Sequence, residues 1–341
     1  MTESIVQKNI PLAPLTTFNV GGPAEHFIEV QDEEMLVEAF AFAKREGLAI
    51  TVLGGGSNVL IADDGIQGLV IKNSIGGITY TEKDSEVEVT AGAGVVWDEL
   101  VEDVVVRGLW GIENLSAIPG TVGATPVQNV GAYGVEVAEL ITGVRVYDAH
   151  EKTFTTLSPR ECAFGYRDSI FKHTQGIRYV VTKVHYTLSK SPVPKLEYKD
   201  LQSTFGEGDA PTLMEIRDAV IAIRKKKFPP LAEVGTAGSF FKNPLLSQED
   251  FDALKEKYPA LPGFPAERGT VKVPLGWILE HVLCVRGVRE GAVGTYKGQA
   301  LVLVNHGGAT STEVDAFANM IEKKVFDATG IVVEREVQMK S

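Results

Sequence analysis

The sequence predicts an α/β protein made of two parts that separate near residue 190. Short apolar runs alternate with amphipathic segments of helical period along all 341 residues, which is typical of packed layers of strands and helices. The Ser-Pro-Val-Pro stretch at 191–194 is the best candidate boundary. Hydrophobic residues are 44% of the chain, which is too many for a disordered protein.

Helical and strand patterns alternate in the first part. Helices are predicted over 33–45 and 95–107, and strands over 49–53, 69–72, 86–90, 144–148 and 179–188. The first helix ends in Lys44 and Arg45 with Gly47 beyond them, which suits the helix dipole and a C-terminal cap. The glycine-rich segment 116–134 lacks periodicity and is predicted to be a loop.

The second part has the same alternation. Helices are predicted over 213–227, 248–257 and 311–328, and strands over 300–305 and 331–338. The last strand carries charges among its apolar residues, and alternation would place Glu334 on the same face as Val332. That carboxylate either meets water at a strand end or belongs to a site.

Charge and composition exclude several classes of protein. The balance of 33 Lys+Arg against 45 Asp+Glu gives a net charge of −12, which argues against a nucleic-acid binder but allows a local basic pocket. Cys162 and Cys284 stand alone, so we expect reduced thiols rather than a disulfide scaffold. There is no membrane-length apolar run, no signal-peptide pattern and no histidine spacing for a metal, so we expect a cytoplasmic protein without membrane partner or metal.

A glycine-rich segment at 54–58 follows a predicted strand. Glycines let a backbone approach a ligand closely, and their exposed N–H groups bind phosphate oxygens. The segment matches neither GxGxxG nor GxxxxGK[ST], so it is not a Rossmann or P-loop motif. A plain turn is the alternative.

Three further motifs each leave two interpretations open. Arg167 in 165–169 is either a binding group or a surface residue paired with Asp168. Ser239 follows Gly238 outside any GxSxG motif, so it is either a projecting hydroxyl or part of a turn. The four cations at 224–227 either stabilise a helix end or bind a diphosphate.

Taken in order, six segments closely resemble the UDP-N-acetylenolpyruvoylglucosamine reductase (MurB) family. They are LGGGSNVL at 53–60, IPGTVGA at 118–124, PVQNVGAYG at 126–134, GYRDS at 165–169, GSFFKNP at 238–244 and EREV at 334–337. The segment KLEYKDL around Tyr198 resembles the longer, type I form. Arg335 departs from the pattern, because some relatives have proline there.

The resemblance implies an α+β fold with a FAD-binding domain of the type shared with vanillyl-alcohol oxidase and p-cresol methylhydroxylase (PCMH/VAO type). That domain would span 1–190 as two α/β subdomains, about 1–75 and 76–190, with an α/β substrate-binding domain over 191–341. The implied activity is the NADPH-dependent reduction of UDP-N-acetylglucosamine enolpyruvate to UDP-N-acetylmuramate through noncovalent FAD, in peptidoglycan synthesis.

The resemblance also assigns catalytic roles. Hydride addition at C3 leaves enolate-like charge at C2 and the carboxylate, and Arg167 and Glu334 would stabilise it, with Glu334 protonated or sharing a proton. Ser239 would donate the proton to C2.

Binding roles carry over in the same way. Tyr198, Lys227, Asn243 and Gln299 would bind the substrate. FAD would be held, mainly through backbone N–H groups, by Gly54, Gly55, Gly56, Ser57, Asn58, Pro119, Gly120, Gly123, Ala124, Gln128, Asn129, Gly131, Ala132 and Tyr133. We expect a monomer whose partners are small molecules only.

Two other functions compete with this one. A flavin oxidase of the same superfamily would pass electrons to oxygen and would often tether its flavin through His or Cys. A non-catalytic nucleotide-binding module would bind without turnover. A metal enzyme is disfavoured by the scattered histidines.

Overall fold

The computed structural model describes residues 5–206 and 208–341, and these form two compact units. Within the described residues the first unit consists of 5–10, 24–55, 67–206 and 208–225, and the second of 11–23, 56–66 and 226–341. The contacts therefore do not divide the chain at the predicted boundary near 190, because 191–225 packs with the first unit. The assignment of 1–190 to FAD binding and of 191–341 to substrate binding stays a prediction.

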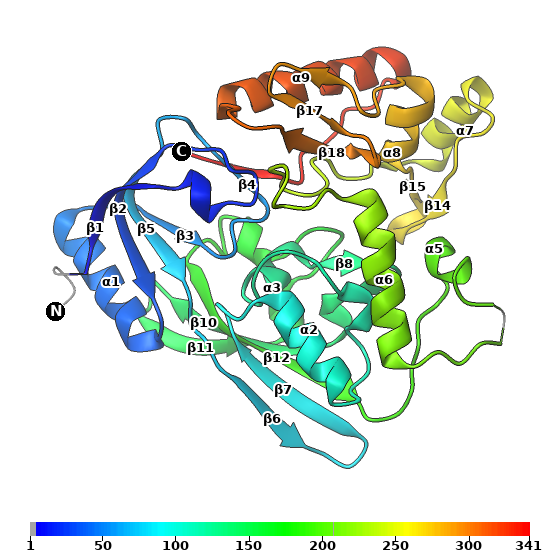
Figure 1. Ribbon diagram of the computed structural model, residues 1–341. Helices are drawn as coiled ribbons and strands as arrows, with labels where there is room; N and C mark the ends of the chain where they lie inside the picture. The colour runs from blue at the N-terminus through cyan, green and yellow to red at the C-terminus, as the bar shows by residue number, and fades with distance from the viewer. Residues whose placement is uncertain (1–4, 207) are drawn as a thin grey trace. The chain divides into compact units, whose positions relative to one another are not determined.

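The two largest sheets of the first unit have five and four strands (Figure 1). The antiparallel sheet has the order β11 (Thr153–Leu157), β10 (Ile141–Asp148), β12 (Tyr179–Ser189), β7 (Glu86–Gly92) and β6 (Ile78–Glu82). The other has the order β1 (Gln7–Pro11), β2 (Pro23–Val30), β5 (Ile66–Asn73) and β3 (Ile50–Leu53), with β3 and β5 parallel. The strands predicted at 49–53, 69–72, 86–90, 144–148 and 179–188 are thus confirmed, with β1, β2, β6 and β11 in addition.

Helix α1 (Glu33–Glu46) confirms the first predicted helix and its capping. Asp32 accepts a hydrogen bond from the backbone N–H of Met35, and Gly47 ends the helix with φ 68°. The apolar face of α1, with Leu36 and Ala39 fully buried, packs in one cluster with residues of β5.

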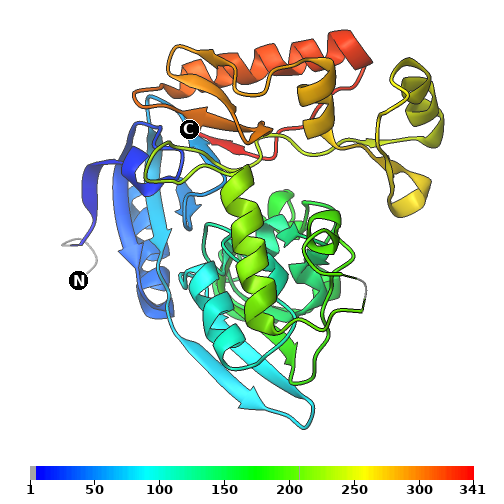
Figure 2. The same cartoon turned by 45° about the vertical axis from the view of Figure 1, so that its right-hand side comes forward.

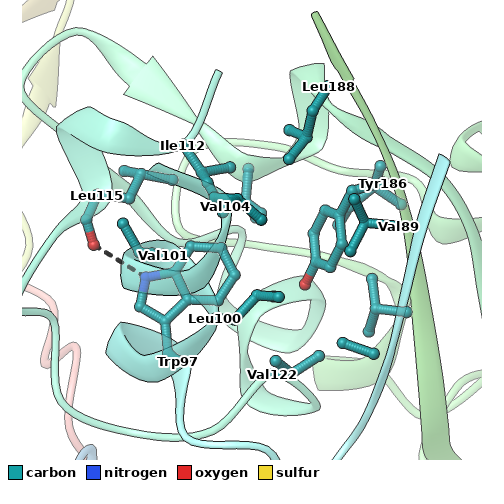
Figure 3. Packing of buried hydrophobic residues seen from close by; sticks show 14 of the residues in the cluster. Val89, Trp97, Leu100, Val101, Val104, Ile112, Leu115, Val122, Tyr186 and Leu188 are labelled. Carbon is teal, nitrogen blue, oxygen red and sulfur yellow. Dashed lines mark hydrogen bonds between the residues drawn. The ribbon is translucent and has the colours of Figure 1, made fainter. Parts of the chain in front are cut away.

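The largest core of the first unit lies around α2 (Trp97–Val106) and α6 (Leu213–Lys227). Figure 3 shows Trp97 and Tyr186 among aliphatic side chains, with the indole Nε1 donating to the carbonyl of Leu115 at 2.9 Å. Helices α2 and α6 lie side by side (Figure 2), and Arg217 of α6 binds Asp98 of α2 through two hydrogen bonds of 2.7 and 3.0 Å. Both predicted helices are therefore present, and α2 begins at Trp97 rather than at residue 95.

The second unit has three small sheets. Their members are β16 (Arg289–Glu290), β17 (Val293–Tyr296) and β18 (Gln299–Asn305); β13 (Leu245–Leu246), β15 (Val271–Lys272) and β14 (Phe264–Pro265); and the parallel pair β4 (Val59–Ile61) and β19 (Gln338–Lys340). Helices α7 (Gln248–Lys257), α8 (Leu275–Trp277) and α9 (Ser311–Thr329), with a π-helical turn at Ile278–Val282, complete its core. Helix α9 begins with a Thr310–Glu313 capping box and ends at Gly330 with φ 73°.

Two predicted elements were wrong. The segment 116–134 is not one loop, because it contains α3 (Ala124–Gln128) and β8 (Gly131–Ala132), which pairs with β9 (Val135–Glu136). The strand predicted over 331–338 forms only from Gln338 onward, where β4 supplies a pairing partner. Val332 is 82% exposed and Glu334 is exposed too, so these two residues share the solvent face as predicted, although the segment is not a strand.

Shorter elements connect these parts. They are α4 (Pro159–Cys162), α5 (Lys199–Gln202) and the 3-10 turns Ala13–Leu15, Glu113–Leu115, Val137–Glu139, Ile170–Lys172 and Glu267–Gly269. Cys162 is buried, Cys284 is exposed and both are free thiols, as expected.

Candidate functional site

The glycine turn after β3 packs directly against a second loop of the first unit. A Cβ built on Gly54 would lie 2.9 Å from Oγ1 of Thr121, and one on Gly55 would lie 2.7 Å from the Cα of Gly120. No side chain fits at these distances, so the two backbones touch only because both residues are glycine. This close approach forms the floor of a backbone cradle.

The same turn presents unused backbone donors. Within the described residues, the N–H groups of Gly55, Gly56 and Ser57 donate no hydrogen bond to the protein. The carbonyl of Gly54 is turned the other way and accepts from the ammonium group of Lys72, whose pKa is lowered by burial. A row of free N–H groups is what an anion such as phosphate binds.

The facing loop, 119–124, is fastened to the strand end before α2. Gly123 donates to the carbonyl of Ala93 at 2.9 Å, and a Cβ on Gly123 would lie 2.6 Å from the Cβ of Ala93. Oγ1 of Thr121 is buried and has no hydrogen-bond partner among the described residues. A buried hydroxyl without a partner costs free energy, so it points to a ligand that the site is built to receive.

Arg167 faces the backbone of the neighbouring loop. It adopts φ 52°, and its guanidinium donates to the carbonyl of Asn129 at 3.4 Å and to that of Gly131. Asp168 instead binds Nε2 of His173 at 2.8 Å. The alternative in which Arg167 is a surface residue paired with Asp168 is therefore wrong.

Asn129 is committed to the protein. Its Nδ2 donates to Glu136 at 2.8 Å and to the carbonyl of Gly165 at 2.9 Å, and its Oδ1 accepts from the N–H of Ala138 at 3.2 Å. The residue is 1% exposed. Its side chain holds the Arg167 turn to the loop, which leaves only its backbone for the cofactor contact that we expect.

The rest of that loop brings an expected cofactor residue against an expected substrate residue. Tyr133 follows Ala132 and packs edge to face on Tyr198, with ring centroids 5.3 Å apart. Tyr133 is 7% exposed and its burial raises its pKa to about 12, whereas Tyr198 is 42% exposed.

Gln128, another expected cofactor residue, accepts a hydrogen bond from Lys172 at 3.0 Å.

In the second unit, Ser239 lies on a short extended segment beside β18. It forms an antiparallel bridge with Val302, and the next residue, Phe240, donates to the carbonyl of Leu301 at 2.9 Å. Gly238 has φ 77°, a conformation that favours glycine, just before the serine. The half-buried hydroxyl of Ser239 makes no hydrogen bond within the described residues, so it is available to a ligand.

Two carboxylates lie on the segment paired with 240–242. Glu334 has a side chain 71% exposed and forms an ion pair with Lys242. Glu336 is half-buried, and its N–H donates to the carbonyl of Phe240 at 2.9 Å. Asn58 donates to the carbonyl of Glu336 at 3.2 Å, so part of its side chain is used within the protein.

The remaining expected substrate residues of this unit differ in their surroundings. Oδ1 of Asn243 accepts from the N–H of Leu275 at 2.9 Å. Gln299 begins β18, and its Oε1 is buried without a partner among the described residues. Lys227 is the last residue of α6. An orphaned acceptor at Gln299 fits a ligand that donates a hydrogen bond.

Sequence reasoning missed Thr121 and Asn114 as individual residues. Asn114 is fully buried and donates to the carbonyls of Tyr133 and Lys195, both at 2.8 Å. Thr121 is not a glycine, and it was recognised only as part of its motif. No local signal marks either residue, because the partners of Asn114 are distant in sequence and the burial of the Thr121 hydroxyl depends on the folded structure.

Comparison with known proteins decides the family. The UDP-N-acetylenolpyruvoylglucosamine reductase of Ralstonia nicotianae is 39% identical to the chain, over 98% of the chain and 98% of its own length. The reductase of Chromobacterium violaceum is 41% identical, over 96% of the chain and 97% of its own length. The reductase of Cupriavidus pinatubonensis is 42% identical, over 96% of the chain and 96% of its own length. The chain belongs to the UDP-N-acetylenolpyruvoylglucosamine reductase family. A FAD binding domain model matches residues 24–157, and the model of the family's C-terminal domain matches 229–340.

A solved reductase of this family has the same fold. The Thermus caldophilus enzyme (MurB) is 25% identical, superposes with a TM-score of 0.70, and the match covers 98% of this chain and 99% of that one. The expected α+β fold with a FAD-binding domain and a C-terminal domain is confirmed.

The residues present fit the FAD that this family's domain binds. Within the described residues of the first unit, the cradle offers the N–H group of Gly55 and the unpartnered hydroxyl of Thr121, and a side chain at Gly54 or Gly55 would collide with the facing loop. Among the described residues no acidic, histidine or cysteine cluster could hold a metal, and no helix is long and apolar enough to cross a membrane.

Proposed function

We propose that this chain reduces the enolpyruvyl ether of UDP-N-acetylglucosamine to UDP-N-acetylmuramate with NADPH, through noncovalently bound FAD, in peptidoglycan precursor synthesis. The observation that carries this function is identity of about two residues in five over almost the full length of named reductases. Each residue role is the one that the motif resemblance implies, and the surroundings of the side chain support it where they are described.

FAD, when bound, supplies the hydride chemistry between NADPH and the substrate, while the protein orients the reactants. In our proposal the N–H group of Gly55 donates to a phosphate oxygen of the cofactor. The hydroxyl of Thr121 gains an acceptor there, which removes the cost of its unpaired burial.

Arg167 stabilises the negative charge that develops on the substrate carboxylate and C2. Hydrogen bonds to two carbonyls of the 129–131 backbone fix the orientation of the guanidinium. A preorganised cation of this kind lowers the barrier because it need not reorient during the reaction.

Ser239 donates the proton to C2. A serine hydroxyl is a weak acid, so it can act only on a strongly basic, enolate-like carbon within hydrogen-bond reach. Its freedom from protein hydrogen bonds leaves it able to point at the substrate.

A carboxylate of the 334–336 segment assists this charge stabilisation and proton transfer. We assign the role to Glu334. One observation favours Glu336 as a second candidate, because its backbone is bonded to Phe240, next to Ser239, whereas Glu334 is exposed and paired with Lys242.

Substrate binding completes the proposal. Lys227 and Asn243 bind the diphosphate region, Gln299 the uridine, and Tyr198 closes over the substrate. The segment 1–190 provides the FAD domain and 191–341 the substrate domain. The enzyme works as a cytoplasmic monomer on small molecules alone.

Replacing Ser239 tests the proposed function. In Ser239→Ala we expect anaerobic NADPH to bleach the flavin at the normal rate, while product formation falls about 100-fold or more, the size of a general-acid effect. Ser247→Ala, which removes an exposed helix cap of the same unit, is the matched control and should keep full turnover. Equal turnover in Ser239→Ala would falsify the proton-donor role. Rapid oxygen consumption by the reduced wild type would favour an oxidase. Binding of the nucleotide without turnover by the wild type would favour a nucleotide-binding module.

A further inference from the structure

Arg335, in the EREV segment, is bound to three side chains of one helix. Its Nε donates to Glu322 at 2.5 Å, its Nη1 to Asp315 at 2.5 Å and its Nη2 to Asn319 at 2.8 Å. These acceptors are three and four residues apart, so they stand on one face of α9. The planar guanidinium fork matches this row of oxygens, which the ammonium of a lysine could not do.

The same residue lies beside the segment that carries Ser239. Arg335 forms an antiparallel bridge with Phe241, and its guanidinium carbon lies 5.8 Å from the ring centroid of Phe240. Both phenylalanines are 1% exposed. One side chain therefore connects α9, the aromatic pair and the backbone that carries both candidate carboxylates.

The segment 331–337 is anchored at its two ends by the buried side chains of Ile331 and Val337, and Arg335 supplies a side-chain connection between them. It is not a regular strand, and backbone hydrogen bonds fix it only from residue 334, through Glu334 to Lys242 and Glu336 to Phe240. Val332, two residues before Glu334, is 82% exposed.

We propose that Arg335 is a positioning residue, which clamps the 334–336 backbone to α9 and so sets the distance between its carboxylate and Ser239. This inference rests on the proposed function for those two groups.

The backbone pattern makes proline a usable test at this position. Lys242 donates to the carbonyl of Glu334, and Glu336 donates to that of Phe240, so Phe241 and Arg335 form the pair that exchanges no hydrogen bonds. A proline at 335 therefore removes no ladder bond, and it favours the extended conformation that the bridge requires of residue 334.

The experiment compares Arg335→Ala and Arg335→Pro in the FAD-loaded enzyme. Lys323→Ala on α9 is the matched control, because Lys323 forms an exposed ion pair with Asp327 and no other ion pair among the described residues. In Arg335→Ala we expect kcat for product formation to fall about 10-fold, at unchanged rate of flavin reduction by NADPH, because a small misplacement of reacting groups is costly. We expect Arg335→Pro to recover most of this loss, and Lys323→Ala to lose nothing.

Hydrogen–deuterium exchange gives a readout that does not depend on turnover. Peptides covering 334–337 should exchange about 10-fold faster in Arg335→Ala than in the wild type, and at near wild-type rates in Arg335→Pro. If Arg335→Ala folds poorly, the double variant Asp315→Asn/Glu322→Gln weakens the same clamp with Arg335 in place. Unchanged exchange and kcat in both would overturn the proposal.

The two readouts separate this inference from the proposed function. If Ser239→Ala and both carboxylate variants keep full activity, the proposed roles fail, yet exchange still reports whether the clamp exists. If those roles hold and Arg335→Ala changes exchange without changing kcat, Arg335 is only a structural residue.

Discussion

Lys242 and Glu334 form an ion pair between the two backbone segments that meet at the Phe241–Arg335 bridge. The two ends of this pair differ, because the Lys242 side chain is 13% exposed and that of Glu334 is 71% exposed. The carboxylate is therefore the end of the pair that contacts water. Removing it leaves the largely buried ammonium group of Lys242 without its counter-ion.

Neutralising each carboxylate in turn distinguishes the two candidates. If Glu334 acts in the reaction, Glu334→Gln should lower kcat for product formation about 100-fold and leave flavin reduction by NADPH intact. Glu336→Gln is the matched variant, two residues away on the same segment. A loss confined to Glu336→Gln, measured by single-turnover product formation, would transfer the role to Glu336.

Gly55→Ala should abolish stable FAD binding. The new Cβ would lie 2.7 Å from the Cα of Gly120, so the two loops must separate. Gly76→Ala is the control, because a Cβ there meets nothing within 4 Å. The ratio of flavin to protein absorbance after gel filtration measures retention, and a fully yellow Gly55→Ala protein would contradict the cradle.

Thr121→Val should separate cofactor binding from stability. The substitution keeps the shape and removes a buried hydroxyl that has no protein partner, so we expect unchanged or higher thermal stability of the FAD-free protein. FAD affinity, measured by fluorescence quenching, should fall about 5-fold or more, as the loss of one hydrogen bond predicts. Equal affinity would mean that the hydroxyl does not touch the cofactor.

Glu113→Gln should stabilise the protein above acid pH. Glu113 is 2% exposed, and burial raises its pKa above the ordinary 4.5, although the N–H of Gly111 donates to it at 2.6 Å. A raised folded-state pKa means that the group's contribution is fully favourable below 4.5 and is lost as pH rises through the folded value.

The advantage of Glu113→Gln in free energy of unfolding should therefore grow with pH over that window and then level off. Denaturant unfolding at a series of pH values, with saturating FAD, measures it. Glu256→Gln, an exposed glutamate of α7, should show no such trend. A constant difference across the series would exclude ionisation of Glu113 as the cause.

Periodicity and capping identified the long elements. Helices α1, α6, α7 and α9 lie within one or two residues of their predicted bounds, because each has a local start or stop such as Asp32, Ser247 or Gly330. The prediction of a final strand over 331–338 was wrong for 331–337. Only the residues from 338 onward pair with a strand, β4, which lies far away in sequence. Local patterns cannot show whether a partner strand is present.

The candidate site was predictable as motifs but not as contacts. Glycine patterns marked both loops of the cradle, yet the pairing of Gly55 with Gly120 depends on the folded arrangement. The alternative partner for Arg167, Asp168, was adjacent in sequence and turned out to bind His173. Side-chain commitments of this kind, like those of Asn129, follow only from tertiary structure.

The parallel pairing of β4 with β19 has a consequence for synthesis in the cell. Residues 59–61 leave the ribosome early, but the strand that completes them, 338–340, follows only after almost the whole chain. Until then the apolar Val59-Leu60-Ile61 edge has no native partner and is exposed to aggregation or chaperone capture. Extensions or deletions beside residue 340 should therefore lower the yield of folded protein more than their distance from the proposed catalytic groups suggests.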